Sequence, residues 1–185
     1  MGYLKGIPYE PEDRGVGDPN IGFSPLKGRP KDSVQIPEAC NEPGLLDALQ
    51  RLNAPKTAFF TSGCEKCYNQ RGGKERPIGY MEFVHNSIAM ARDKNTYWQI
   101  LQGLDDEMTT EAYDLPVDFE FIVSPTQFND HFIDGYSAAV YVRHCDYLPY
   151  KIARRRWRQA LGFLTTFLCS RPIGPAPHFY GDHVT

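Results

Sequence analysis

The sequence lacks an apolar run long enough to cross a membrane. Its longest apolar stretch, Leu161 to Cys169, is interrupted by Gly162, Thr165 and Thr166, whereas a transmembrane helix needs about 18 or more apolar residues in succession. The first residues also lack the apolar segment of a secretory signal peptide. We therefore expect no membrane span and a cytoplasmic location.

The chain also lacks an excess of basic residues. It has 20 lysines and arginines against 23 aspartates and glutamates, which gives a formal net charge of −3. General nucleic-acid binders and proteins that dock on anionic membranes need a strongly basic surface. We therefore expect a protein partner or a homo-oligomer rather than a nucleic acid.

Cysteine is scarce, and its arrangement is not that of a disulfide-stabilised protein. The five cysteines are an odd number and are widely scattered, at Cys40, Cys64, Cys67, Cys145 and Cys169. A disulfide framework requires an even number at regular spacings. The pattern favours reduced thiols in a reducing compartment.

Several motifs that mark enzymes are absent. The sequence contains no serine nucleophile elbow, no H-E-x-x-H zinc motif and no dinucleotide-binding glycine fingerprint. Gly72-Gly73-Lys74 is followed by Glu75 rather than by serine or threonine, so it does not form a P-loop. We favour a non-catalytic protein on these grounds.

Proline and glycine divide the chain into three parts. Residues 1–44 hold seven prolines and seven glycines, and the stretch 170–185 has a similar composition with aromatic residues. Proline and glycine at this density forbid long helices. Both segments also carry apolar side chains, whereas a flexible linker is rich in glycine and serine or in charged residues. We predict an extended arm at 1–44, one domain at 45–169 and an extended tail at 170–185.

The middle of the chain predicts alternating helices and strands. Helical spacing of apolar residues and capping signals indicate helices, and alternation with polar residues indicates strands. The predicted helices are 45–52, 78–92, 96–108 and 150–168, and the predicted strands are 57–60, 117–123 and 137–147. We expect an α+β fold with a small mixed or antiparallel sheet packed by about four helices, carrying extended Pro/Gly-rich N- and C-terminal arms.

A C-x-x-C pair, Cys64 and Cys67, follows the first predicted strand. Such a pair serves as a redox dithiol when it begins a helix, or as half of a tetrahedral zinc site. The glycines at 72 and 73 leave little room for a helix after it, and a zinc site needs two further ligands, for which Cys40 and His85 are candidates. A third interpretation is that both are passive thiols.

Acidic and basic residues are concentrated in separate ranges within the C-terminal half of the chain. The range 105–120 holds seven acidic residues and no basic one, whereas 143–158 holds six basic residues and one acidic residue. In the predicted last helix, Arg154, Arg155 and Arg158 share the side opposite the apolar stripe. This basic face predicts docking to an acidic surface.

Together these patterns predict a non-catalytic interaction or assembly subunit. It docks a partner protein or a second copy through its extended arms and its basic helix face, because ordered arms need a surface that offsets their lost entropy. The alternative is a thiol redox or zinc-dependent protein that uses Cys64 and Cys67; a weaker one is a hydrolase built on His131 with Asp130 and Asp134. The predicted binding residues are Tyr3, Tyr9, Phe23, Arg154, Arg155 and Arg158.

Overall fold

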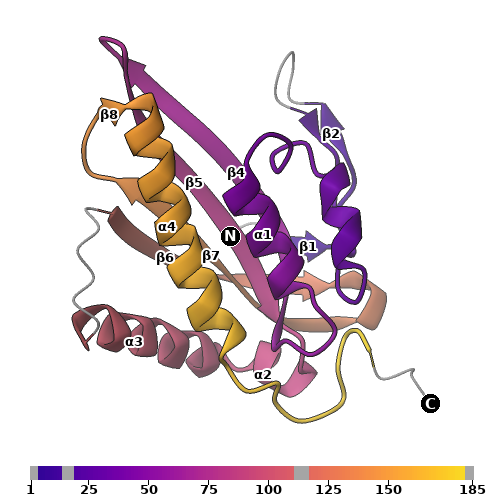
Figure 1. Ribbon diagram of the computed structural model, residues 1–185. Helices are drawn as coiled ribbons and strands as arrows, with labels where there is room; N and C mark the ends of the chain where they lie inside the picture. Colours follow the sequence, from indigo (N-terminus) through magenta and orange to yellow (C-terminus); the bar gives the residue numbers. More distant parts are fainter. Residues whose placement is uncertain (1–3, 14–18, 111–116, 182–185) are drawn as a thin grey trace.

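In the computed structural model, which describes residues 4–13, 19–110 and 117–181, a curled β-sheet carries helices on one face (Figure 1). The fold is mixed α+β. One side of the sheet is a long hairpin formed by β4 (Phe59–Arg71) and β5 (Lys74–His85). Gly72 and Gly73 make the turn with φ angles of 56° and 73°, a left-handed conformation that glycine adopts without steric cost.

A second hairpin completes most of the sheet. It consists of β6 (Val117–Phe128) and β7 (Ile133–His144), joined by the short 3-10 turn η2 (Asn129–His131). The strand order is β1-β6-β7-β5-β4, where β1 (Lys5–Ile7) adds to β6 in parallel and the other neighbours are antiparallel. A two-residue strand, β8 (Leu148–Pro149), pairs with the start of β5. β4 therefore lies at one edge of the sheet.

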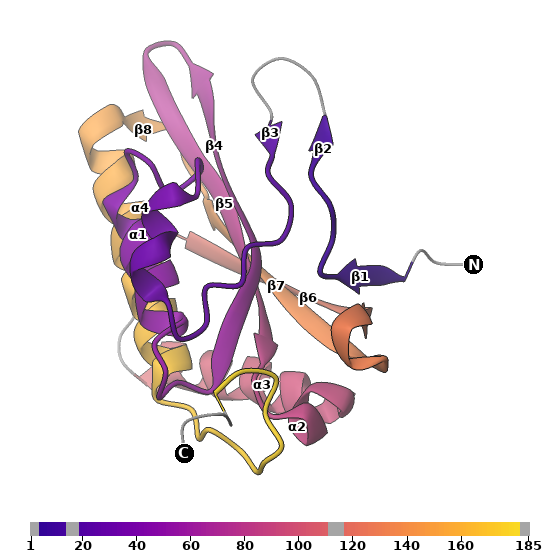
Figure 2. The ribbon, with the colours of Figure 1, turned by 90° about the vertical axis from the view of Figure 1, so that its right-hand side faces the viewer.

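Two helices, α1 (Pro43–Leu52) and α4 (Tyr150–Cys169), pack side by side against one face of the sheet (Figures 1 and 2). The side chains of β5 and β7 that point to this face include Met81, Phe83 and Val140, all fully buried. At Gly79 of β5, a Cβ atom would lie 2.6 Å from the Trp157 ring. Glycine at this position thus lets α4 approach the sheet closely.

The remaining helices lie at one end of the sheet. A short helix, α2 (Ile88–Arg92), leads into α3 (Lys94–Thr110), whose buried residues Tyr97, Ile100 and Leu104 join the main core. The Tyr97 hydroxyl donates a hydrogen bond of 2.6 Å to the carbonyl of Tyr136 on β7. No helix in the described part of the chain is long and apolar enough to cross a membrane.

The described part of the N-terminal segment packs on the domain itself. It contains β1, the small hairpin β2 (Glu12–Asp13) with β3 (Pro19–Asn20), and the 3-10 turn η1 (Pro30–Gln35). Leu26, Ile36 and Ala39 are buried in the main core. The buried Lys27 ammonium donates hydrogen bonds to three backbone carbonyls of the connection between α1 and β4, those of Ala54, Thr57 and Phe59.

The C-terminal segment packs on the domain as well. Phe179 is buried in a second apolar cluster with Ile7, Phe60, Val84, Ala91 and Phe128. Asn86 fixes this segment, because its side chain bonds the backbone of Tyr180 in both directions, at 2.8 and 3.1 Å. At both ends of the described chain, contacts with the chain's own domain therefore offset the conformational entropy that is lost when the segment becomes ordered.

Two sequence predictions about the middle of the chain are wrong in kind or in extent. The predicted helix 78–92 is strand β5 followed by the five-residue α2, and the predicted strand 57–60 extends to Arg71, with a bulge between Thr61 and Gly63 in place of a turn. The predicted helix 96–108 corresponds to α3, Lys94–Thr110. From Ile78 to Val84, Glu82 is the only charged residue of β5, because this part of the strand is an interior strand of the sheet and is covered on both faces.

Candidate functional site

A groove runs along the free edge of β4. It has a volume of about 760 Å³, and one wall is formed by Thr61 to Glu65 of β4. The opposite wall comes from the N-terminal segment, mainly Tyr9 to Glu12 and Asn20 to Gly22. Figure 2 shows the β2–β3 hairpin standing beside the β4–β5 hairpin. A volume of this size is in the usual range of ligand-binding clefts, about 300–1,000 Å³.

The edge of β4 is blocked at one end and open along the rest. At Thr61 the backbone N–H donates to the Asn53 side chain at 3.0 Å, and Asn53 also donates to the Thr61 hydroxyl at 2.7 Å. At Ser62 the carbonyl accepts a hydrogen bond of 2.9 Å from the Tyr9 hydroxyl. From Gly63 to Arg71, β5 is the only strand that pairs with β4 in the described part of the chain. Alternate backbone groups there point away from β5.

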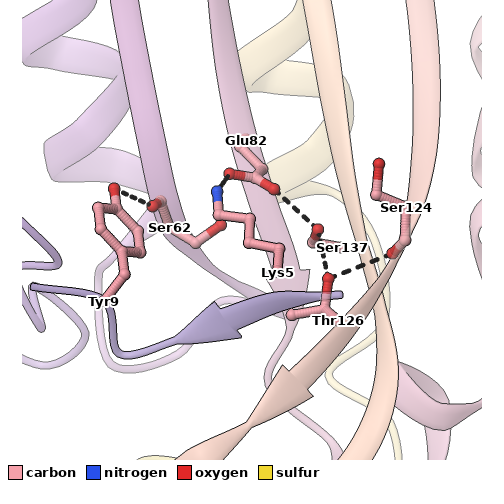
Figure 3. A network of polar contacts seen from close by, with 7 residues as sticks. All are labelled: Lys5, Tyr9, Ser62, Glu82, Ser124, Thr126 and Ser137. Carbon is pink, nitrogen blue, oxygen red and sulfur yellow. Dashed lines mark hydrogen bonds and ion pairs between the residues drawn. The ribbon is translucent and has the colours of Figure 1, made fainter. Parts of the chain in front are cut away.

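A polar network inside the curl of the sheet holds the N-terminal segment in place (Figure 3). The Lys5 ammonium of β1 forms an ion pair with the Glu82 carboxylate of β5, which is only 5% exposed. The second oxygen of Glu82 accepts a hydrogen bond of 2.8 Å from Ser137, whose hydroxyl lies 2.8 Å from that of Thr126. Four strands, β1, β5, β6 and β7, thus contribute to one hydrogen-bonded chain, which positions the groove wall.

The groove is lined by more acidic than basic side chains. Glu10 and Glu12 come from the N-terminal segment, Glu38 precedes α1, and Glu65 lies on β4. Burial first, and then the negative charges of Glu82 and Glu65, raise the pKa of Tyr80 on the neighbouring strand above its usual range. Among the described residues that line the groove, carboxylates thus outnumber ammonium and guanidinium groups.

The C-x-x-C pair does not form one site. Cys64 and Cys67 are three residues apart on the regular part of β4, where they pair with Met81 and Ile78, so their side chains point to opposite faces of the sheet. Cys64 packs against the main core and Cys67 is exposed. Burial, followed by the negative charge of Glu38, raises the pKa of the Cys64 thiol to about 12, which suppresses its nucleophilic thiolate form.

The proposed further zinc ligands lie elsewhere. The exposed Cys40 thiol lies 3.7 Å from the carbonyl of Val34, and His85 is buried with its ring against Phe59. Burial lowers the pKa of His85 to about 4, and its Nδ1 accepts the backbone N–H of Ser87 at 3.1 Å. In the described residues, no three His, Cys, Asp or Glu side chains are grouped as a metal site.

Two of the three predicted docking arginines are engaged within the domain. Arg158 pairs with Glu42 at 2.7 Å, and Arg154 lies 3.5 Å from Glu75 while stacking over the rings of Tyr68 and Tyr150. Arg155 is exposed. Sequence reasoning missed Glu42 and Glu75, because both are far from α4 in the sequence and no spacing rule connects them.

Of the three aromatic residues of the arm that were predicted to bind a partner, the structure describes Tyr9 and Phe23. Tyr3 lies outside the described residues. Tyr9 and Phe23 pack against each other edge to face, with ring centroids 6.3 Å apart, and both border the second apolar cluster. The predicted hydrolase residue His131 is exposed in η2, with its ring against Phe179.

No family model, curated protein or solved structure matches this chain.

Proposed function

We propose that this protein is a non-catalytic interaction module that binds an extended segment of a partner protein as an additional strand along β4. The observation that carries the proposal is the edge of β4 from Gly63 to Arg71, which no second strand of the described residues pairs, with a groove of about 760 Å³ at its start. In strand addition, backbone hydrogen bonds supply the affinity and side-chain pockets supply the selectivity.

The N-terminal segment has a different part in this proposal from the one the sequence suggested. Because Lys5, Tyr9 and Leu26 are fixed to the domain, the segment serves as a wall of the groove instead of reaching out to a partner. A preformed wall lowers the entropy cost of binding. Docking through the basic face of α4 rests on Arg155, since Arg154 and Arg158 already have acidic partners.

A natural edge strand needs protection against uncontrolled pairing. β4 carries Glu65, Lys66 and Arg71 along its open part, and Asn53 covers its start. Charged side chains discourage pairing with arbitrary apolar strands while leaving the backbone accessible. This combination suits selective rather than general strand addition.

The five free cysteines favour a reducing compartment such as the cytoplasm for this module. The redox alternative is less well supported, because the side chains of Cys64 and Cys67 point away from each other. A zinc site would need ligands that the described residues do not bring together.

Selection of random peptides from a display library on the purified protein tests the proposal. The selected peptides should lose binding when alternate amides on one edge of the peptide are N-methylated, because methylation removes the donors that pair with β4. The matched control is the same peptide methylated at the intervening amides, which should bind as the parent does. Equal loss of binding for both methylation patterns, or for neither, would contradict strand addition.

A further inference from the structure

The side chains around the groove indicate which kind of segment it accepts. Lys5 is the only basic residue that lines the groove in the described part of the chain, and its charge is neutralised by Glu82. Against it stand four glutamates, and three of them, Glu10, Glu38 and Glu65, form no ion pair with a described basic residue. The groove therefore presents uncompensated negative charge along an open strand edge.

The pKa of the Cys64 thiol on β4 is affected by the charges around the groove. Burial raises the pKa of the Cys64 thiol most, followed by the negative charge of Glu38; the ammonium of Lys66 lowers it, and Glu65 raises it by less. Glu38 and Glu65, which both line the groove, thus act on β4, where Lys66 is the opposing charge. A cation in the groove would be attracted from two sides.

A buried hydroxyl at the start of the open edge is a second indication of a binding site. Ser62 lies in the bulge of β4, between Tyr9 and Lys5 (Figure 3), and is 3% exposed. Its Oγ has no hydrogen-bond partner among the described residues, although buried hydroxyls are normally paired. Ser62 is also one of the residues that line the groove, so its unpaired hydroxyl belongs to the proposed site.

We propose that the groove along β4 accepts an extended segment rich in lysine or arginine from another protein, an inference that rests on the proposed function. Charge complementarity selects this occupant. A second copy of the same chain is disfavoured, because a symmetric pairing would bring two acidic grooves together. The segment places basic side chains between Glu65 on one wall and Glu10 and Glu38 on the others.

Two labelled octapeptides test this inference by fluorescence anisotropy, one of alternating lysine and valine and one of alternating glutamate and valine. At an ionic strength of about 50 mM, where screening is weak, we expect the lysine peptide to bind at least about tenfold more tightly. The triple variant E10Q/E38Q/E65Q should weaken binding of the lysine peptide by about tenfold. The matched triple variant D105N/D134N/D146N removes the same charge from exposed residues elsewhere, and it should bind as the parent protein does.

The outcomes separate the two proposals when amide exchange of Gly63 to Arg71 is followed with each peptide. If the glutamate peptide binds as tightly and protects these amides, strand addition stands and the basic segment is excluded. If the lysine peptide binds equally well to both triple variants, its attraction is non-specific and the inference is wrong. If neither peptide protects the amides of β4, the proposed function fails and the inference fails with it.

Discussion

Lys5 and Glu82, which are 77 residues apart in the sequence, form an ion pair that ties the N-terminal segment to the interior strand β5 of the sheet. The carboxylate of Glu82 is buried, while the side chain of Lys5 remains about one third exposed. A buried carboxylate needs such a partner, since an unpaired charge is costly to bury. The pair therefore connects the stability of the sheet to the position of the groove wall.

Replacement of Glu82 by glutamine should destabilise the fold and loosen the N-terminal segment. Glutamine keeps an acceptor for Ser137 but loses the charge that pairs with Lys5, and we expect a loss of about 1–3 kcal/mol in the free energy of unfolding. Urea denaturation measures this loss, and limited proteolysis reports the segment. A stability unchanged within about 0.5 kcal/mol would show that the ion pair contributes nothing.

Arg158 and Arg155 offer a matched pair of substitutions on α4. Glu42 is fully buried and is bonded to Arg158 and to the Tyr68 hydroxyl. Arg158→Met should therefore destabilise the protein by about 2–3 kcal/mol, because it leaves a buried carboxylate without its cation. Arg155→Met, at an exposed position, should change the free energy of unfolding by less than about 0.5 kcal/mol. Equal effects of the two substitutions in thermal denaturation would contradict the structural role of Arg158.

His85 should make the protein less stable in mild acid. Burial lowers its pKa in the folded state from 6.5 to about 4, so between these values the unfolded chain binds more protons than the folded one. The stability contributed by neutral His85 is fully present above about pH 6.5 and is lost as the pH falls toward about 4, by about 2–3 kcal/mol in total.

The variant His85→Gln isolates this contribution. Its free energy of unfolding should fall less steeply between pH 6.5 and 4 than that of the parent protein, as measured by urea denaturation at a series of pH values. The remaining slope belongs to other titrating groups. Identical slopes for the two proteins would mean that His85 takes up its proton as readily in the folded protein as in the unfolded chain, which would contradict the lowered pKa.

The cysteine pair should behave as two unrelated thiols. Cys67 is exposed and should react quickly with a thiol reagent at about pH 8, whereas Cys64 should react much more slowly in the folded protein because it is partly buried and its pKa is raised. Mild oxidation should produce no Cys64–Cys67 disulfide, as judged by peptide mass spectrometry. Rapid formation of that disulfide in the folded protein would restore the redox alternative.

Zinc provides a separate test of the same residues. If Cys64 and Cys67 hold a structural metal, then Cys67→Ser should lower the melting temperature, and metal analysis of the purified protein should find about one zinc per chain. We expect neither result, because the two side chains lie on opposite faces of β4. The exposed Cys145→Ser is the control substitution.

Amphipathic elements could be predicted from the sequence, whereas fully covered ones could not. The alternation in β6 and the apolar stripe of α4 each have one buried face, and both elements appear near their expected positions. β5 has no such alternation, because helices cover one face and the N-terminal segment covers Glu82 on the other. The pair Gly72-Gly73 between two strands is a sequence pattern typical of a β-hairpin. The charged residues on both sides of this pair resemble a solvent-exposed loop, so the hairpin was not predicted.

The candidate site was less predictable than the fold. The groove depends on long-range contacts such as Lys5 with Glu82 and Tyr9 with Ser62, and no local sequence pattern specifies which distant residues meet. The C-x-x-C spacing suggested a shared site because the predicted strand ended at residue 60, before both cysteines. Because β4 continues as a strand through both cysteines, the same residues form an edge instead.

The most direct test of strand addition is amide hydrogen exchange of β4 in the presence of a selected peptide. We expect alternate amides between Gly63 and Arg71 to exchange markedly more slowly when the peptide is bound, while the amides of α3, which lies at one end of the sheet, keep their rates. Unchanged exchange along β4 at saturating peptide, or protection confined to α3 or α4, would contradict the proposal that this edge is the binding site.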